Sequence, residues 1–114
     1  MPRLLRPLFW LAVAIVLFMT LRPLTIIIPT SDKTQHAVTF AMLMALAIVA
    51  YPRARLAALA VSLSGLGAAI ELIQPYFGRS DDILDWVADT VGIAIVLVIA
   101  ALIRAVLARQ ARGA

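Results

Sequence analysis

Residues 71–92, with the sequence ELIQPYFGRSDDILDWVADTVG, form a polar stretch between two long apolar runs. Five of the six acidic residues of the chain lie in this stretch. The sixth, Asp32, precedes another apolar run, and His36, the only histidine, follows it at helical spacing. Because ionisable side chains are costly to place next to lipid, this clustering predicts that they share one site.

The composition indicates an integral membrane protein. The chain has 114 residues, which predicts a single domain, 1–114, and it is 64% hydrophobic but only 14% charged. It has no cysteine, which excludes disulfides, thiolate metal sites and a cysteine nucleophile. Its net charge of +4 comes from short basic clusters beside apolar runs, which are typical of topology signals, so we expect no nucleic-acid binding.

The apolar runs predict an all-α fold, a bundle of four transmembrane helices arranged as two helical hairpins. The expected spans cover residues 7–28, 33–51, 56–74 and 82–107. In the first span, the apolar run ends at Arg22 and Pro23 after a length of about 22 Å, which is short for a hydrocarbon core of ~30 Å. Either Arg22 reaches outward to the headgroups, or the helix continues through residues 25–28 with a kink at Pro23. No small-x-small cleavage site follows, so we expect a retained helix rather than a cleaved signal peptide.

Charged and aromatic residues predict the orientation. One end of the four spans carries seven arginines, namely Arg3, Arg6, Arg53, Arg55, Arg104, Arg109 and Arg112, and the other end carries Arg22, Lys33, Arg79 and all six acids. Aromatic residues are expected at both membrane faces, with Trp10 and Tyr51 at the first end and Tyr76, Phe77 and Trp86 at the second. The positive-inside rule then predicts that both termini lie in the cytoplasm and that the acidic end faces outward.

Three helices are expected to present polar groups at a similar depth near the outer end. The sets that share a helix face are Asp32, His36 and Phe40, then Glu71 and Gln74, then Asp82, Asp85, Asp89 and Gly92. Convergence of these faces would shelter the ionisable groups from lipid. The pattern therefore predicts a polar pocket that opens to the outside.

The candidate catalytic residues are His36, Glu71 and Asp85. His36 suits a general base, a metal ligand or a proton relay, and Glu71 beside Gln74 suits an acid/base with an orienting amide. In a purely structural interpretation, His36 is a hydrogen-bond partner that ties the second span to the fourth. Glu71 and Gln74 are then polar contacts that hold the bundle together.

The candidate binding residues are Asp32, Lys33, Gln74, Arg79, Ser80, Asp82 and Asp89. Arg79 suits a phosphate or carboxylate ligand, or else it pairs with a neighbouring acid to set the turn. Asp32 is equally suited to cap a helix, and Lys33 to balance an acid or to reach the headgroups. Ser80 is a poor candidate nucleophile, and we expect Gly92 to allow close helix packing.

The acidic residues leave a divalent-cation site open as an alternative. Asp82, Asp85 and Asp89 with His36 and Glu71 would supply oxygen-rich ligands. Against a metal, the chain has no HExxH motif and a single histidine. We assign no metal ligands, and the sequence does not determine whether a cofactor is used.

The same residues resemble a known family. They read DKxxHxxxF over residues 32–40, ExxQ over 71–74 and RSxDxxDxxxDxxG over 79–92, in an order and spacing similar to those of the VanZ-like membrane proteins. The chain differs from the family pattern at three positions. Asp89 stands where the family usually has Asn, and Asp81 where it more often has an aromatic or apolar residue. Gly78 is not directly preceded by a proline. The resemblance implies a small multi-helix membrane protein linked in some bacteria to glycopeptide (teicoplanin) resistance, and it supplies no established reaction.

Three functions follow as hypotheses. The first is an enzyme that acts at the outer leaflet on a lipid-linked or cell-envelope saccharide or phosphate, and the second is a non-catalytic protein that binds or excludes an envelope precursor or a glycopeptide antibiotic. The third is ion transport through a homo-oligomer, which is disfavoured because no polar residues continue toward the cytoplasmic half beyond Ser62 and Ser64. The expected partners are the lipid bilayer, a lipid-linked precursor or glycopeptide, and a second copy of the chain if it is a homo-oligomer.

Overall fold

The computed structural model describes residues 2–21, 32–77 and 82–113, and within these ranges every regular element is helical. The elements are α1 (Pro2–Leu21), α2 (Asp32–Ala50), α3 (Leu56–Ile73), the 3₁₀ helix η1 (Gln74–Phe77) and α4 (Ile83–Gly113). All four α-helices of the described chain are long and apolar enough to cross a membrane. The all-α class and the multi-pass membrane character are confirmed.

Two helices extend beyond one end of the spans predicted for them. Helix α1 begins at Pro2, five residues before the predicted start, and contains Pro7 within it. Proline is favoured at a first helical position, where its missing N–H would be unpaired in any case. Helix α4 continues to Gly113, six residues beyond the predicted end, because its Ala-, Leu- and Arg-rich tail consists of strong helix formers. The predicted alternatives at Arg22, Pro23 and residues 25–28 lie outside the described residues.

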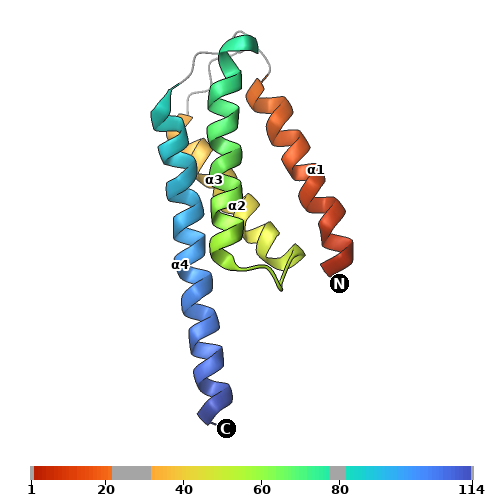
Figure 1. The fold of residues 1–114 in the computed structure, drawn as a ribbon, viewed down its shortest axis with the longest axis vertical. Coiled ribbons are helices and arrows are strands. Elements are labelled where there is room, and N and C mark those ends of the chain that lie inside the picture. Colours follow the sequence, from red (N-terminus) through yellow and green to blue (C-terminus); the bar gives the residue numbers. More distant parts are fainter. Residues whose placement is uncertain (1, 22–31, 78–81, 114) are drawn as a thin grey trace.

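Helix α2 lies at the centre of the bundle. It packs against α1, α3 and α4, and its contact with α4 is the most extensive. Figure 1 shows that α1 begins and α4 ends toward the same end of the bundle, and that the last turns of α4 extend beyond the other helices. Every residue from 101 to 113 is exposed, in agreement with this extension.

The core is apolar, and so is most of the outer surface. Buried apolar side chains come from all four helices: Phe9, Val13, Phe40, Leu43, Met44, Ala47, Ala50, Leu63, Ile70 and Ile93. Large apolar side chains also point outward along each helix, such as Leu4, Val61, Leu72 and Leu102, each more than half exposed. A surface of this kind is expected where lipid, rather than water, surrounds the helices.

A glycine sets the distance between α2 and α4. A Cβ atom at Gly92 would overlap the carbonyl oxygen of Ala37 and lie 2.8 Å from its carbonyl carbon. Only a residue without a side chain allows the two backbones to approach this closely. The predicted packing role of Gly92 is confirmed.

Helix α1 is held against the end of α2 by an aromatic and basic contact. Trp10 Nε1 donates a hydrogen bond to the Tyr51 hydroxyl at 2.7 Å. Arg6 Nε donates to the carbonyl of Ala50 at 3.2 Å, and its guanidinium carbon lies 4.8 Å from the centre of the Tyr51 ring. The two aromatic residues predicted at one membrane face are therefore in direct contact.

Candidate functional site

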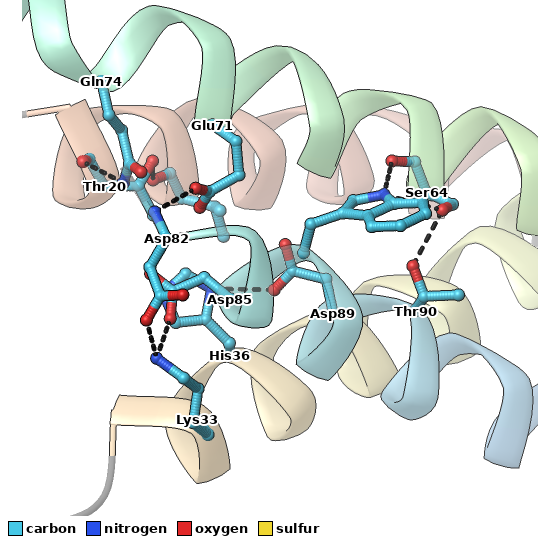
Figure 2. A network of polar contacts seen from close by, with 12 residues as sticks. Thr20, Lys33, His36, Ser64, Glu71, Gln74, Asp82, Asp85, Asp89 and Thr90 are labelled. Atoms are coloured by element: carbon cyan, nitrogen blue, oxygen red, sulfur yellow. Dashed lines mark hydrogen bonds and ion pairs between the residues drawn. The ribbon is translucent and has the colours of Figure 1, made fainter. Parts of the chain in front are cut away.

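The first part of the polar cluster is an ion-pair network between the starts of α2 and α4. Lys33 Nζ lies 2.7 Å from Asp82 Oδ2 and 2.6 Å from Asp85 Oδ1 (Figure 2). The side chains of Lys33 and Asp82 are 40% and 44% exposed, whereas that of Asp85 is 9% exposed. Lys33 therefore links the exposed rim of the cluster to its interior.

Asp82 also caps α4. Its Oδ1 accepts a hydrogen bond from the backbone N–H of Leu84 at 2.9 Å, which is the geometry of a helix N-cap. The Lys33 ammonium beside it and this N–H lower the pKa of the Asp82 carboxyl, because both stabilise its charged form. The predicted start of the last helix near residues 81–82 agrees with this cap.

His36 lies one turn deeper and joins α2 to α4. Its Nδ1 is 2.8 Å from Asp89 Oδ1, and its Nε2 is 3.7 Å from Asp85 Oδ2. All three side chains are buried, and Asp89 is only 2% exposed. Carboxylates thus face both ring nitrogens of His36. Only a protonated imidazole can donate a hydrogen bond from each of its two nitrogens.

Glycine makes room for this buried pair on α3. A Cβ atom at Gly67 would lie 2.7 Å from Asp89 Oδ2. Gly67 therefore leaves the space on α3 that this carboxylate occupies.

Glu71 brings α3 into the cluster. One of its carboxylate oxygens, Oε2, accepts a hydrogen bond from the backbone N–H of Asp82 at 2.8 Å. A carboxylate suits this place because the first N–H groups of a helix carry a partial positive charge. The sequence predicted Glu71 on the polar face, but not that its partner would be a backbone group of α4.

Gln74 lies one turn further along, in η1, and its side chain is only 1% exposed. Its Nε2 donates to the backbone carbonyl of Thr20 in α1 at 3.1 Å. Its Oε1 is buried and accepts no hydrogen bond within the described part of the chain. Gln74 therefore joins a fourth helix to the cluster and leaves one acceptor open.

A second polar layer lies deeper between α3 and α4. Trp86 Nε1 donates to the Ser64 carbonyl at 3.0 Å and also lies 3.2 Å from its hydroxyl, which is 2.9 Å from the Thr90 hydroxyl. The sequence predicts Trp86 as an interfacial aromatic residue and does not single out Thr90 or Thr20. The i, i+4 spacing of Trp86 and Thr90, facing the small residues of α3, is the signal that could have found this layer.

The structure brings most of the predicted site residues together from three helices, as Figure 2 shows. Those connected are Lys33, His36, Glu71, Asp82, Asp85 and Asp89, with Gln74 beside them. Asp32 is the first residue of α2, and its side chain is not among those described. Arg79 and Ser80 lie outside the described residues.

The chemistry of this cluster is that of paired charges and hydrogen bonds. Within residues 2–21, 32–77 and 82–113, no group of three or more His, Asp or Glu side chains is arranged to hold a metal ion. The carboxylates face an ammonium, an imidazole and backbone N–H groups instead.

Comparison with known proteins adds no relative: no family model, no curated protein and no solved structure matches this chain. The VanZ-like resemblance therefore rests on the motif residues alone and stays a prediction.

Proposed function

We propose that this chain is a multi-pass protein of the bacterial inner membrane that binds a cell-envelope amphiphile at the outer end of its bundle. The observation that carries the proposal is the convergence of Lys33, His36, Glu71 and Asp85 from three helices, at one end of an otherwise apolar bundle. Ionisable groups at membrane depth are costly and generally mark functional sites. The resemblance to VanZ-like proteins supports a lipid, a glycan or a glycopeptide antibiotic such as teicoplanin as the ligand.

Charge supports the proposed orientation. The end of the bundle opposite the cluster holds Arg6 and the turn with Arg53 and Arg55, and α4 carries Arg109 and Arg112 beyond it. Under the positive-inside rule this end is cytoplasmic, which places both termini in the cytoplasm. The polar cluster then lies in the outer leaflet, where envelope lipids and glycopeptides are found.

The contacts favour binding over catalysis. A general base needs a free lone pair directed at the substrate. Both nitrogens of His36 face carboxylates, and Asp85 is engaged by Lys33. These pairings hold the groups in place and partly neutralise them, which suits recognition of a polar headgroup.

The proposal is tested with Glu71→Gln, which keeps an acceptor oxygen for the Asp82 N–H and removes the charge. Gly65→Ala is the matched control, because a Cβ at Gly65 meets nothing within 4 Å. Both variants and the parent chain are expressed in a teicoplanin-susceptible bacterium at equal membrane levels. Susceptibility, teicoplanin binding to the purified protein and mass spectra of the envelope lipids and glycans are then compared.

For a binding protein, the parent chain and Gly65→Ala raise resistance and bind teicoplanin or an envelope lipid. Glu71→Gln loses both together, and the mass spectra show no covalent product. An enzyme is indicated instead if Glu71→Gln retains binding but loses resistance and a covalent product disappears. Unchanged susceptibility and no retained ligand with the parent chain would overturn the proposal.

A further inference from the structure

The outer end of the bundle has an excess of hydrogen-bond acceptors over cationic donors. From the sequence, six acidic residues are predicted at this end, against three basic residues and one histidine. Four of the acids, Glu71, Asp82, Asp85 and Asp89, lie in the described cluster with Lys33 and His36 as its cationic side chains. A cluster with this balance is complemented by a ligand that brings positive charge and N–H donors.

Lys33 shows which cation these carboxylates accept. Its primary ammonium lies between Asp82 and Asp85 with N···O distances of 2.7 and 2.6 Å, which are charge-assisted hydrogen bonds. An ammonium group has three N–H donors on one nitrogen, so it can serve several acceptors at once. A ligand with the same group would find similar acceptors nearby.

Within the described residues, Glu71 and Gln74 form a second set of acceptors, which no ammonium group contacts. Glu71 accepts one hydrogen bond, from the Asp82 N–H, and Gln74 Oε1 accepts none within the described chain although its side chain is 1% exposed. In Figure 2 the ends of the Gln74 and Glu71 side chains both lie next to Asp82. A buried amide oxygen without a donor is unfavourable, so a ligand that donates to it gains affinity.

Exposure indicates the side from which a ligand reaches these acceptors. Asp82 and Lys33, at the rim, are close to half exposed, whereas His36, Asp85 and Asp89 behind them are buried. A headgroup therefore approaches from the outer surface past Asp82. Exposed apolar side chains of α3, which include Leu72, are available to an apolar part of the ligand.

We propose that Glu71 and Gln74 Oε1 bind the primary ammonium group of an amphiphilic ligand. The inference rests on the proposed function and names its ligand class. The ammonium donates one hydrogen bond to the Glu71 carboxylate and one to Gln74 Oε1. The group can belong to an ethanolamine-type lipid headgroup or to a soluble amine, and both present the same donors.

The test uses the full-length protein purified in a neutral detergent and two lysolipids of equal chain length. One has a phosphoethanolamine headgroup and the other a phosphocholine headgroup, which has the same charge but no N–H donor on its nitrogen. We expect the ethanolamine lysolipid to bind at least about tenfold more tightly, the difference typical of charge-assisted hydrogen bonds. Equal affinity for the two headgroups overturns the proposal.

Free ethanolamine identifies the source of the ammonium. Displacement of the ethanolamine lysolipid by millimolar ethanolamine supports recognition of the amine alone, as in a soluble ligand. Absence of displacement, with the headgroup preference intact, supports a lipid as the ligand.

Two variants connect the preference to these residues. We expect Glu71→Gln and Gln74→Met each to lower the headgroup preference by about threefold or more, because the first replaces a carboxylate with a neutral amide and the second removes the amide oxygen. Ser62→Ala is the control, since the Ser62 hydroxyl is exposed and bonded within its own helix to Ala58. A headgroup preference that survives both substitutions overturns the assignment to these residues. If circular dichroism shows that a variant does not fold, the comparison of the two headgroups on the parent chain still tests whether the ammonium group is recognised.

The inference and the proposed function fail in different ways. Equal binding of the two headgroups, with Glu71-dependent resistance in cells, removes the ammonium site and leaves the proposed function standing. A clear headgroup preference without any effect on susceptibility or envelope ligands removes the proposed function and leaves the site.

Discussion

Replacement of Gly92 by alanine should force α2 and α4 apart. The added Cβ would overlap the carbonyl oxygen of Ala37 and lie 2.8 Å from its carbonyl carbon and 3.1 Å from its Cα. These are backbone atoms within a helix, so no side-chain rotation can relieve the overlap. Restoring a carbon–carbon contact of about 3.5–4.0 Å requires the helices to separate locally by about 1 Å.

The cost follows from what this interface holds. A gap of 0.5–1 Å removes roughly a quarter to a half of the dispersion energy of each atom pair across it. Groups inserted into packed cores typically reduce the free energy of unfolding by about 1–3 kcal/mol. The same helices carry Phe40 and Ile93, both nearly fully buried, and the pair of His36 with Asp89. After subtraction of a gain of up to ~1 kcal/mol from alanine's helix propensity, we expect a net destabilisation of about 1–2 kcal/mol.

Gly65→Ala is the matched control for this measurement. It makes the same chemical change at a helix position with open space around it, so only the propensity gain of up to ~1 kcal/mol applies. Unfolding of both variants in mixed micelles, followed by circular dichroism, gives the two free energies on one scale. If Gly92→Ala is as stable as Gly65→Ala, the close approach of α2 and α4 is not what Gly92 provides, and the packing argument is refuted.

Two further predictions concern the ionisable residues. His36→Ala leaves the buried Asp89 carboxylate without its imidazole partner, so we expect the free energy of unfolding to fall by about 3–5 kcal/mol in the same assay. The double variant His36→Ala/Asp89→Ala should recover part of this loss, because the unpaired carboxylate is then absent. A loss below ~1 kcal/mol would contradict the pairing. Asp82 has a pKa below its ordinary value of 3.8, so its bond to Lys33 should contribute stability that is fully present above this value and is lost as the pH falls through the lower folded-state pKa. We would measure the free energy of unfolding of the parent chain and of Asp82→Asn from pH 7 to about pH 2. The parent chain should be the more stable at neutral pH, and the difference in free energy should narrow below about pH 4. A difference that does not change with pH would argue against the ion pair.

Several features of the site could be predicted from single helices. The i, i+4 and i, i+7 spacings placed His36 and the acids of α4 on the faces that meet, and Gly92 was expected to lie at a packing interface. These predictions hold because each depends only on helical periodicity and on the cost of exposing charge to lipid. The hydroxyl and indole contacts of Ser64 and Trp86 were missed, since neutral polar groups are common in membrane helices and their spacing alone does not identify a partner.

The apolar runs in the sequence predicted a helical membrane protein, because segments of this length can satisfy their backbone hydrogen bonds in lipid only as helices. The order of charged residues along the chain also predicted that the acids gather at one end and seven of the nine arginines at the other. The tertiary structure decided which groups pair: His36 with Asp89, Lys33 with Asp82 and Asp85, and Glu71 with a backbone N–H. These pairings depend on the rotation and register of one helix against another. Rotation and register are set by the contact between the two backbones, so they cannot be predicted from the periodicity of a single helix.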